Sequence, residues 1–302
     1  MPELLMALWP LFALILAGQA MRRAQFPSDT FWPGAERINY FVLFPALLFN
    51  SLATAPLDNP ALPRLAVAVL LGLGLAWLAL LLARRLFGWT AARFGAISQG
   101  VLRFNTYLGL AMIGSLFGAE GLGLAALMLA LMVPTVNIMS VWALTAERGL
   151  SLRTLLLPII KNPLILACLA GVLINLSGLG LPGGSDRLLG LLAAASLPLG
   201  LLCVGAALQP KELRGEVPSL GWNSVLRLLA MPLLAWGVAR GLDLPVMETS
   251  LLIVFFALPT APTSYVLTRQ LGGDSQLMAG IITLQTLLAA ASLPLLLVVL
   301  GV

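Results

Sequence analysis

The sequence predicts an all-α membrane protein with ten transmembrane helices, arranged as two inverted five-helix repeats with broken crossing helices 4 and 9. Composition is the first observation: the 302 residues are 60% hydrophobic and only 10% charged, with a mean hydropathy of +1.01. Soluble domains carry roughly 25% charged residues. We therefore expect membrane lipid around most of the chain. We expect the charged residues behind the net charge of +5 to lie in loops beside the membrane surface, and we expect no nucleic-acid partner.

Ten apolar runs of about 20 residues, each long enough to cross a bilayer, are the second observation. The loops between them are short, so no stretch predicts a soluble domain. The first run predicts a retained helix, not a signal peptide, because Glu3 stands where a basic region belongs and Arg22 and Arg23 follow the run. The predicted spans are 3–21, 37–55, 62–83, 94–117, 121–145, 155–177, 188–208, 219–240, 248–271 and 276–300.

The basic residues predict the orientation of these spans. Twelve of the Lys and Arg residues lie in or beside loops 1–2, 3–4, 5–6, 7–8 and 9–10, and three lie on the opposite side. Basic residues favour the cytoplasmic side of short loops. The distribution predicts a multi-pass protein of a bacterial inner membrane with both termini outside.

A repeat with a nearly constant offset is the third observation. Pro10 pairs with Pro163 (163 − 10 = 153), Pro45 with Pro198 (198 − 45 = 153), and the glycine at 118 with the glycine at 272 (272 − 118 = 154). The repeats are 1–150 and 151–302. Each holds five spans, an odd number, so the second repeat starts from the opposite side of the membrane. Inverted repeats of this kind are typical of alternating-access transporters.

A polar interruption in the fourth span predicts the first break. Arg103 lies ten residues after Arg93, or about 15 Å at the helical rise, which places it close to the bilayer midplane. An arginine at that depth is costly unless it faces protein, water or an anion. Asn105 and Thr106 compete with helical hydrogen bonds, and we expect both, together with Tyr107, to bind substrate. We expect Arg103 to hold a carboxylate or phosphate, with a structural charge as the alternative.

Two prolines in the ninth span predict the second break. Pro259 and Pro262 have no N–H, so the carbonyls of Phe255 and Leu258 lose their helical donors. A half-helix that restarts near Thr263 would present free N–H groups and a positive dipole end to an anion. The residues expected to bind substrate at this break are Pro259, Thr260, Pro262, Thr263 and Tyr265.

Further polar residues lie within the apolar runs. Asn50 in span two and Asn137 in span five are expected either to line the substrate site or to bond neighbouring helices. The cluster Thr283, Gln285 and Thr286 in span ten is a weaker candidate. Arg227 lies only nine residues past Pro218 on the basic side, so we expect its side chain to snorkel to the membrane rim.

The acidic residues and the lack of histidine exclude several functions. All twelve carboxylates fall in loops or at span ends. No midplane acid is available for a proton relay or a strong Na⁺ site, and an intramembrane hydrolase has no paired acids or histidine. We therefore expect no enzyme activity, no catalytic residue, no metal site and no cofactor.

With these features, the chain resembles the auxin efflux carrier family, which includes bacterial carboxylate permeases and the plant PIN-FORMED auxin exporters. The matching segments cover nearly the whole chain. They are Arg103-x-Asn105 with Gly109, Val133-Pro134-x-x-Asn137, Lys161-Asn162-Pro163 with Gly171, Leu197-Pro198 with Gly205, and Ala257-x-Pro259 with Tyr265 and Gly272.

The resemblance implies a scaffold domain of helices 1, 2, 6 and 7 and a transport domain of helices 3–5 and 8–10 that moves past it. It also implies a homodimer through the scaffold and an organic-anion substrate at the helix 4/helix 9 crossover. One departure is Ala111, where many members carry a proline. Only about ten residues join spans five and six, so the chain is similar to compact bacterial members.

Three functions follow from these observations. The first is a secondary transporter of a small carboxylate, working by an elevator type of alternating access. The second is a Na⁺-coupled symporter resembling the bile-acid sodium symporter family, with carbonyls such as those of Phe255 and Leu258 plus Asn and Gln side chains holding Na⁺. The third is a non-transporting membrane sensor or assembly protein, which would give no substrate flux.

Overall fold

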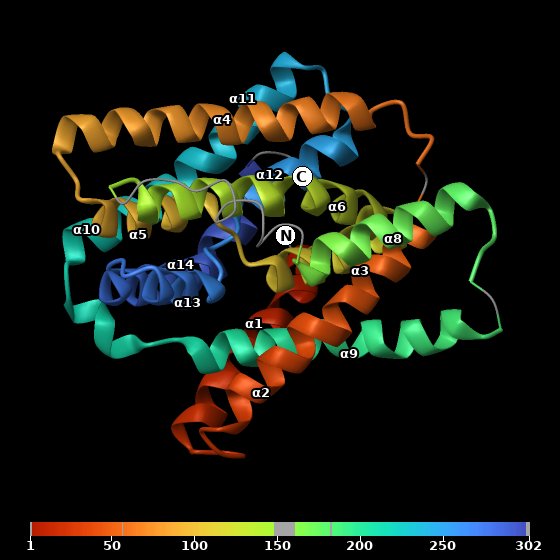
Figure 1. Ribbon diagram of the computed structural model, residues 1–302, viewed down its shortest axis with the longest axis horizontal. Coiled ribbons are helices and arrows are strands. Elements are labelled where there is room, and N and C mark those ends of the chain that lie inside the picture. The colour runs from red at the N-terminus through yellow and green to blue at the C-terminus, as the bar shows by residue number, and fades with distance from the viewer. Residues whose placement is uncertain (1, 56, 148–160, 182, 300–302) are drawn as a thin grey trace. The chain divides into compact units, whose positions relative to one another are not determined.

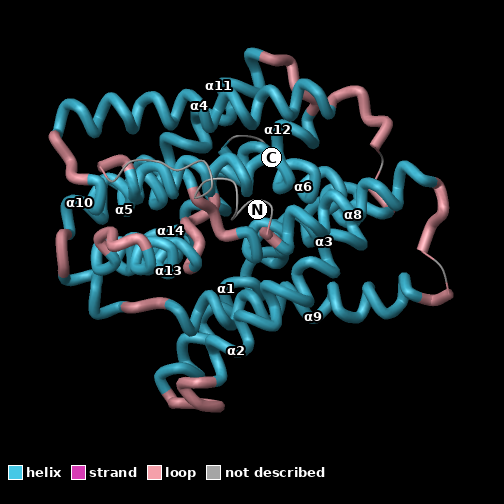
Figure 2. Tube along the Cα trace, viewed as in Figure 1, coloured by secondary structure: helices cyan, strands magenta, loops and turns pink. Residues whose placement is uncertain are grey.

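Helices make up the fold. The computed structural model describes residues 2–55, 57–147, 161–181 and 183–299. It is 83% helical, and the described residues include no strand (Figures 1 and 2). The predicted all-α class is confirmed. The beginning of the predicted sixth span lies outside the described residues.

The chain forms two compact units that interleave the two halves of the sequence. Unit 1 consists of Met1–Pro60, Leu110–Ala130 and Pro158–Ala207. Unit 2 consists of Ala61–Gly109, Leu131–Leu157 and Leu208–Val302. The helices over predicted spans 1, 2, 6 and 7 belong to unit 1, and both predicted helix breaks belong to unit 2.

Unit 1 is held together by helices whose backbones nearly touch. A Cβ atom at Gly18 would lie 2.0 Å from the carbonyl oxygen of Leu202, and one at Gly205 would lie 1.8 Å from that of Ile15. Only glycine allows this approach of α1 and α9, as in other membrane helix pairs. The helices of unit 1 are α1 (Pro2–Arg23), α2 (Phe31–Ile38), the π-helix η1 (Asn39–Leu43), α3 (Phe44–Ala53), the part of α6 (Thr106–Thr145) within Leu110–Ala130, α8 (Pro163–Ser177) and α9 (Ser185–Ala207).

Unit 2 surrounds two interrupted helices. Its short helix pairs are α5 (Ala91–Leu102) with the first turn of α6 (Thr106–Thr145), and α12 (Val246–Ala257) with α13 (Thr263–Gln270). Further helices pack around these pairs. They are α4 (Leu62–Phe87), α10 (Val217–Val225), the π-helix η3 (Leu226–Ala230), α11 (Met231–Gly241) and α14 (Ser275–Val299), with the 3-10 helix η2 (Pro210–Arg214) before α10.

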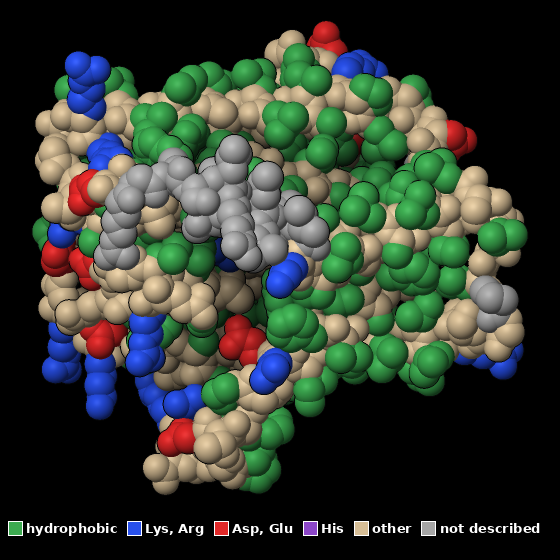
Figure 3. Space-filling view, in the orientation of Figure 1, with side chains coloured by type: hydrophobic (Ala, Val, Ile, Leu, Met, Phe, Trp, Pro, Cys, Tyr) green, Lys and Arg blue, Asp and Glu red, His purple; other side chains and the backbone are tan. Residues whose placement is uncertain are grey.

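One side of α4 shows the surface expected of a lipid-facing helix. Leu75, Leu78, Leu82 and Leu86 are exposed at helical spacing, and residues such as Leu73 on the other side are buried. Hydrophobic side chains also cover much of the face seen in Figure 3. Among the described residues, five helical segments are long and apolar enough to cross a membrane: Leu62–Phe87, Ala91–Thr145, Ser185–Ala207, Val217–Gly241 and Ser275–Val299.

The predicted spans fall on helices throughout the described part of the chain. α6 bends at Gly118, whose φ of +61° is left-handed, and this is the predicted boundary between spans four and five. Gly272, its predicted partner in the second repeat, also has a left-handed φ, of +70°. Ten membrane crossings and the inverted relation of the repeats remain predictions.

Candidate functional site

Both predicted helix breaks are present in unit 2. α5 ends at Leu102, and Arg103 is extended with φ −76° and ψ 151°. α12 ends at Ala257, and Leu258 is extended with φ −62° and ψ 144°. The two preceding helices each have 12 residues. Two half-helices therefore end, and two begin, inside one compact unit.

Two hydrogen bonds join the breaks directly. The backbone N–H of Asn105 donates to the carbonyl of Pro259 at 2.8 Å. Nη2 of Arg103 donates to Oγ1 of Thr263, the first residue of α13, at 3.2 Å. The guanidinium of Arg103 thus lies beside the N-terminal end of α13. The backbone bond between Asn105 and Pro259 joins the same two extended segments.

Asn105 leaves a buried donor beside the start of α6. Its Oδ1 accepts the N–H of Leu108 at 3.1 Å and caps α6. Its Nδ2 is buried and has no hydrogen-bond partner among the described residues. Buried donors are nearly always satisfied, so an unmatched one next to a helix N-terminus indicates a missing acceptor.

The other predicted residues of the breaks divide by exposure. Tyr107, Pro259 and Thr260 are buried. The backbone N–H and the hydroxyl group of Thr260 both form hydrogen bonds within the protein. The N–H of Thr260 donates to Oε1 of Gln285 at 2.9 Å, and its Oγ1 donates to the carbonyl of Gln99 at 3.0 Å. The half-buried residues are Arg103, Thr106, Pro262, Thr263 and Tyr265.

Arg227 corrects one expectation. Its side chain is only 1% exposed, so the prediction that it snorkels to the membrane rim is wrong. Its guanidinium donates to the carbonyls of Leu258 at 2.5 Å, Val101 at 2.7 Å and Phe255 at 2.8 Å. The two carbonyls predicted to lose their donors therefore have new ones, supplied by a side chain from η3.

The side-chain amides of Gln285 and Asn223 donate hydrogen bonds to backbone carbonyls near Arg227. Nε2 of Gln285 donates to the carbonyl of Gly100 at 3.0 Å and to Oδ1 of Asn223 at 2.9 Å. Nδ2 of Asn223 donates to the carbonyl of Ile97 at 2.9 Å. Gln285 was only a weak candidate from its sequence position, and Asn223 was not among the predicted residues. The spacing of Asn223 and Arg227, four residues apart within an apolar span, was the available signal.

The remaining two predicted residues are not joined to the breaks by the contacts described. Asn137 is half-buried in α6, beyond the bend at Gly118. Asn50 is half-buried in α3 and belongs to unit 1. Its backbone carbonyl accepts a hydrogen bond from Oγ1 of Thr54 at 3.1 Å. Their roles as substrate ligands stay predictions.

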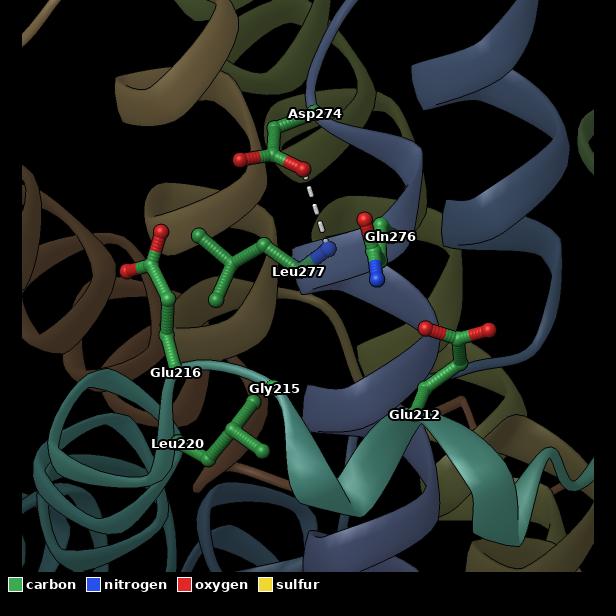
Figure 4. Close-up of a pocket in the computed structure, with 7 residues that line it drawn as sticks. All are labelled: Glu212, Gly215, Glu216, Leu220, Asp274, Gln276 and Leu277. Carbon is green, nitrogen blue, oxygen red and sulfur yellow. Dashed lines mark hydrogen bonds between the residues drawn. The ribbon is translucent and has the colours of Figure 1, made fainter.

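A small pocket of about 150 Å³ lies elsewhere in unit 2, between the η2–α10 region and the start of α14 (Figure 4). Three of its seven lining residues carry a carboxylate and none is basic, so it does not suit an anion. Hydrogen bonds from Arg93 and Ser219 lower the pKa of Glu216 to about 2. The lining residues are Glu212, Gly215, Glu216, Leu220, Asp274, Gln276 and Leu277.

The membrane-crossing helices and the paired breaks define a class of protein, a helical membrane protein of the kind that carries solutes. The sequence matches the family described as membrane transport protein over residues 147–297, half of the chain. The chain belongs to this family, and the predicted resemblance to the auxin efflux carrier family is confirmed. An "uncharacterized transporter" of Methanothermobacter thermautotrophicus (strain Delta H) is 29% identical over 266 residues, covering 86% of each chain.

Proposed function

We propose that this membrane transport protein is a secondary transporter of a small organic anion, and that the carboxylate of the substrate binds at the N-terminal ends of α6 and α13. The observation that carries the proposal is the buried Nδ2 of Asn105, which has no acceptor among the described residues. A carboxylate oxygen is the acceptor that this position suits best, because the surrounding charges are positive.

Electrostatics supports an anion at this place. A helix N-terminus is equivalent to about +0.5 elementary charge, so the starts of α6 and α13 together supply about +1. The guanidinium of Arg103 adds a full charge within hydrogen-bond distance of Thr263. Among the twelve carboxylates of the chain, none lies in either break, between residues 103 and 105 or 258 and 262.

The division into units supports an elevator type of alternating access. Both breaks, and the side chains that satisfy them, belong to unit 2. A unit that contains both helix N-termini and Arg103 can carry a bound anion while keeping these contacts, with the other unit as a fixed support. Dimerisation through unit 1 and an inner-membrane location with both termini outside belong to the same proposal.

The Na⁺-coupled alternative loses its two expected carbonyl ligands. That reading placed Na⁺ on the carbonyls of Phe255 and Leu258, and both accept hydrogen bonds from Arg227. We therefore favour a carrier in which these carbonyls bind no Na⁺.

The Asn105→Asp variant tests the proposal. Asp caps a helix as well as Asn does, so α6 keeps its cap, but the variant replaces the donor with a carboxylate oxygen that repels an anion. We expect purified variant to keep the unfolding temperature of the wild type and to lose the stabilisation that small mono- and dicarboxylates give to the wild type. Gln276→Ala, an exposed change in α14, is the control.

Flux in proteoliposomes completes the test. The wild type should carry the stabilising acid with and without Na⁺, and Asn105→Asp should not carry it. Equal binding and flux in the Asp variant would contradict the proposed site. A wild type that binds an acid and carries none would favour the sensor function.

A further inference from the structure

Arg227 is a fully buried cation whose hydrogen-bond partners are three backbone carbonyls. These carbonyls belong to Val101 at the end of α5 and to Phe255 and Leu258 at the end of α12. Arg227 is the largest of the fully buried side chains described, and it forms no ion pair in the described part of the chain. A buried charge without an ionised partner requires another source of compensation.

Each of the three carbonyls has lost its helical donor for an identifiable reason. The donors would be the N–H groups four residues later. Residues 259 and 262 are prolines and have none. The N–H of Asn105, which would serve Val101, donates instead to the carbonyl of Pro259. The breaks therefore create three acceptors that point to one place.

The charges balance at this place. A helix C-terminus is equivalent to about −0.5 elementary charge, so the ends of α5 and α12 together supply about −1. The guanidinium supplies +1. The neighbouring amides are engaged elsewhere: Nδ2 of Asn223 donates to the carbonyl of Ile97, and Nε2 of Gln285 donates to the carbonyl of Gly100 and to Oδ1 of Asn223. In transporters with broken helices, such carbonyls and helix C-termini are ligands for Na⁺.

We infer that the guanidinium of Arg227 occupies a site for a monovalent cation, formed by the carbonyl oxygens of Val101, Phe255 and Leu258. The side chain acts as a built-in cation that holds the ends of α5 and α12 together, so the crossing needs no bound Na⁺. Removing the side chain opens a site that takes free guanidinium, whose shape it fits, or Na⁺. Arg227 is a positioning residue here, and the inference does not depend on which anion is carried.

The test is cation rescue of Arg227→Ala, measured by thermal unfolding of the purified full-length protein in choline chloride. We expect the unfolding temperature to fall by about 5 °C or more, since about 1 kcal/mol shifts it by 2–4 °C in proteins approaching this size. Millimolar guanidinium or Na⁺ should restore it in part, as expected for a ligand that binds only the folded protein. Arg240→Ala, an exposed change in α11, is the matched control and should show neither effect.

Two further measurements keep the inference testable if Arg227→Ala does not fold. Arg227→Lys keeps a cation in place, so it should unfold at a higher temperature than Arg227→Gln and should not respond to added cations. The wild type should unfold at the same temperature in NaCl and in choline chloride. Specific stabilisation of the wild type by Na⁺ would overturn the inference, and so would an Arg227→Ala or Arg227→Gln variant that responds to cations no more than Arg240→Ala does. Anion binding enters none of these readouts.

Discussion

The N–H of Asn105 donates to the carbonyl of Pro259 across 2.8 Å, so the two interrupted helices are joined backbone to backbone. This bond separates two electrostatic environments. On one side the C-terminal ends of α5 and α12 share the guanidinium of Arg227. On the other side the N-terminal ends of α6 and α13 adjoin Arg103 and the unmatched donor of Asn105. The first environment is complete within unit 2, and the second is the place where we propose that the anion binds.

Arg103→Ala should weaken carboxylate binding by about 10- to 100-fold, the loss expected for hydrogen bonds to a charged group. Arg103→Lys should recover only part of it, because an ammonium does not form the paired bonds of a guanidinium. The rise in unfolding temperature that added carboxylates give to each purified variant measures its affinity. Arg269→Ala, an exposed change near the other end of α13, is the control. Wild-type affinity in Arg103→Ala would give Arg103 a structural role.

Gly205→Ala should destabilise the protein by about 1–3 kcal/mol or more, because the new Cβ would overlap the backbone of α1. The built position lies 1.8 Å from the carbonyl oxygen of Ile15. Gly190→Ala changes the same helix where nothing lies within 4 Å, and it should be neutral or slightly stabilising. Thermal unfolding of both variants decides the point, and equal unfolding temperatures would show that α1 and α9 are not in close contact.

The Arg93–Glu216 pair should make a small, pH-dependent contribution to stability. Hydrogen bonds from Arg93 and Ser219 lower the pKa of Glu216 from 4.5 to about 2 in the folded protein. A lowered folded-state pKa means that the stabilisation is present above about pH 4.5 and is lost as the pH falls toward 2. The carboxylate is half exposed, so the contribution is at most about 1 kcal/mol.

Glu216→Gln should therefore unfold at a slightly lower temperature than the wild type at pH 7, and the difference should disappear toward pH 2. Glu212→Gln removes a carboxylate from the same pocket that takes part in none of the ion pairs described, and is the control. A difference that grows as the pH falls would show that Glu216 is not held as a carboxylate by Arg93.

The positions of the breaks could be predicted because they follow from local chemistry. Pro259 and Pro262 remove backbone donors, and Asn105 offers its own side chain as a helix cap, so neither segment can continue as a regular helix. The membrane class likewise follows from composition. These properties depend on residue type and neighbours along the chain.

The partners across the breaks could not be predicted in the same way. The depth of Arg227 along its span is compatible with a side chain at the rim or in the core, and only the packing of η3 against α5 and α12 decides between them. Asn223 was missed for the same reason. The division into units also depends on tertiary contacts, because each unit combines segments from both halves of the sequence.

Gln285→Met should destabilise the protein and loosen the second break. Gln285 accepts the N–H of Thr260 and donates to the carbonyl of Gly100 and to Asn223. Methionine has a similar volume and offers none of these bonds, so at least two buried backbone groups lose a partner, at about 1–3 kcal/mol for each. A fall in unfolding temperature of several degrees is expected, together with weaker carboxylate binding, because Thr260 no longer fixes the approach to α13.

Gln276→Met supplies the comparison for this change. It makes the same substitution in the same helix at an exposed position, where no buried backbone group loses a partner. The two variants differ only in whether the amide satisfies the interrupted backbone. Equal unfolding temperatures would mean that the break holds its shape without Gln285. A stable Gln285→Met protein with weakened carboxylate binding would instead place the role of Gln285 in shaping the anion site.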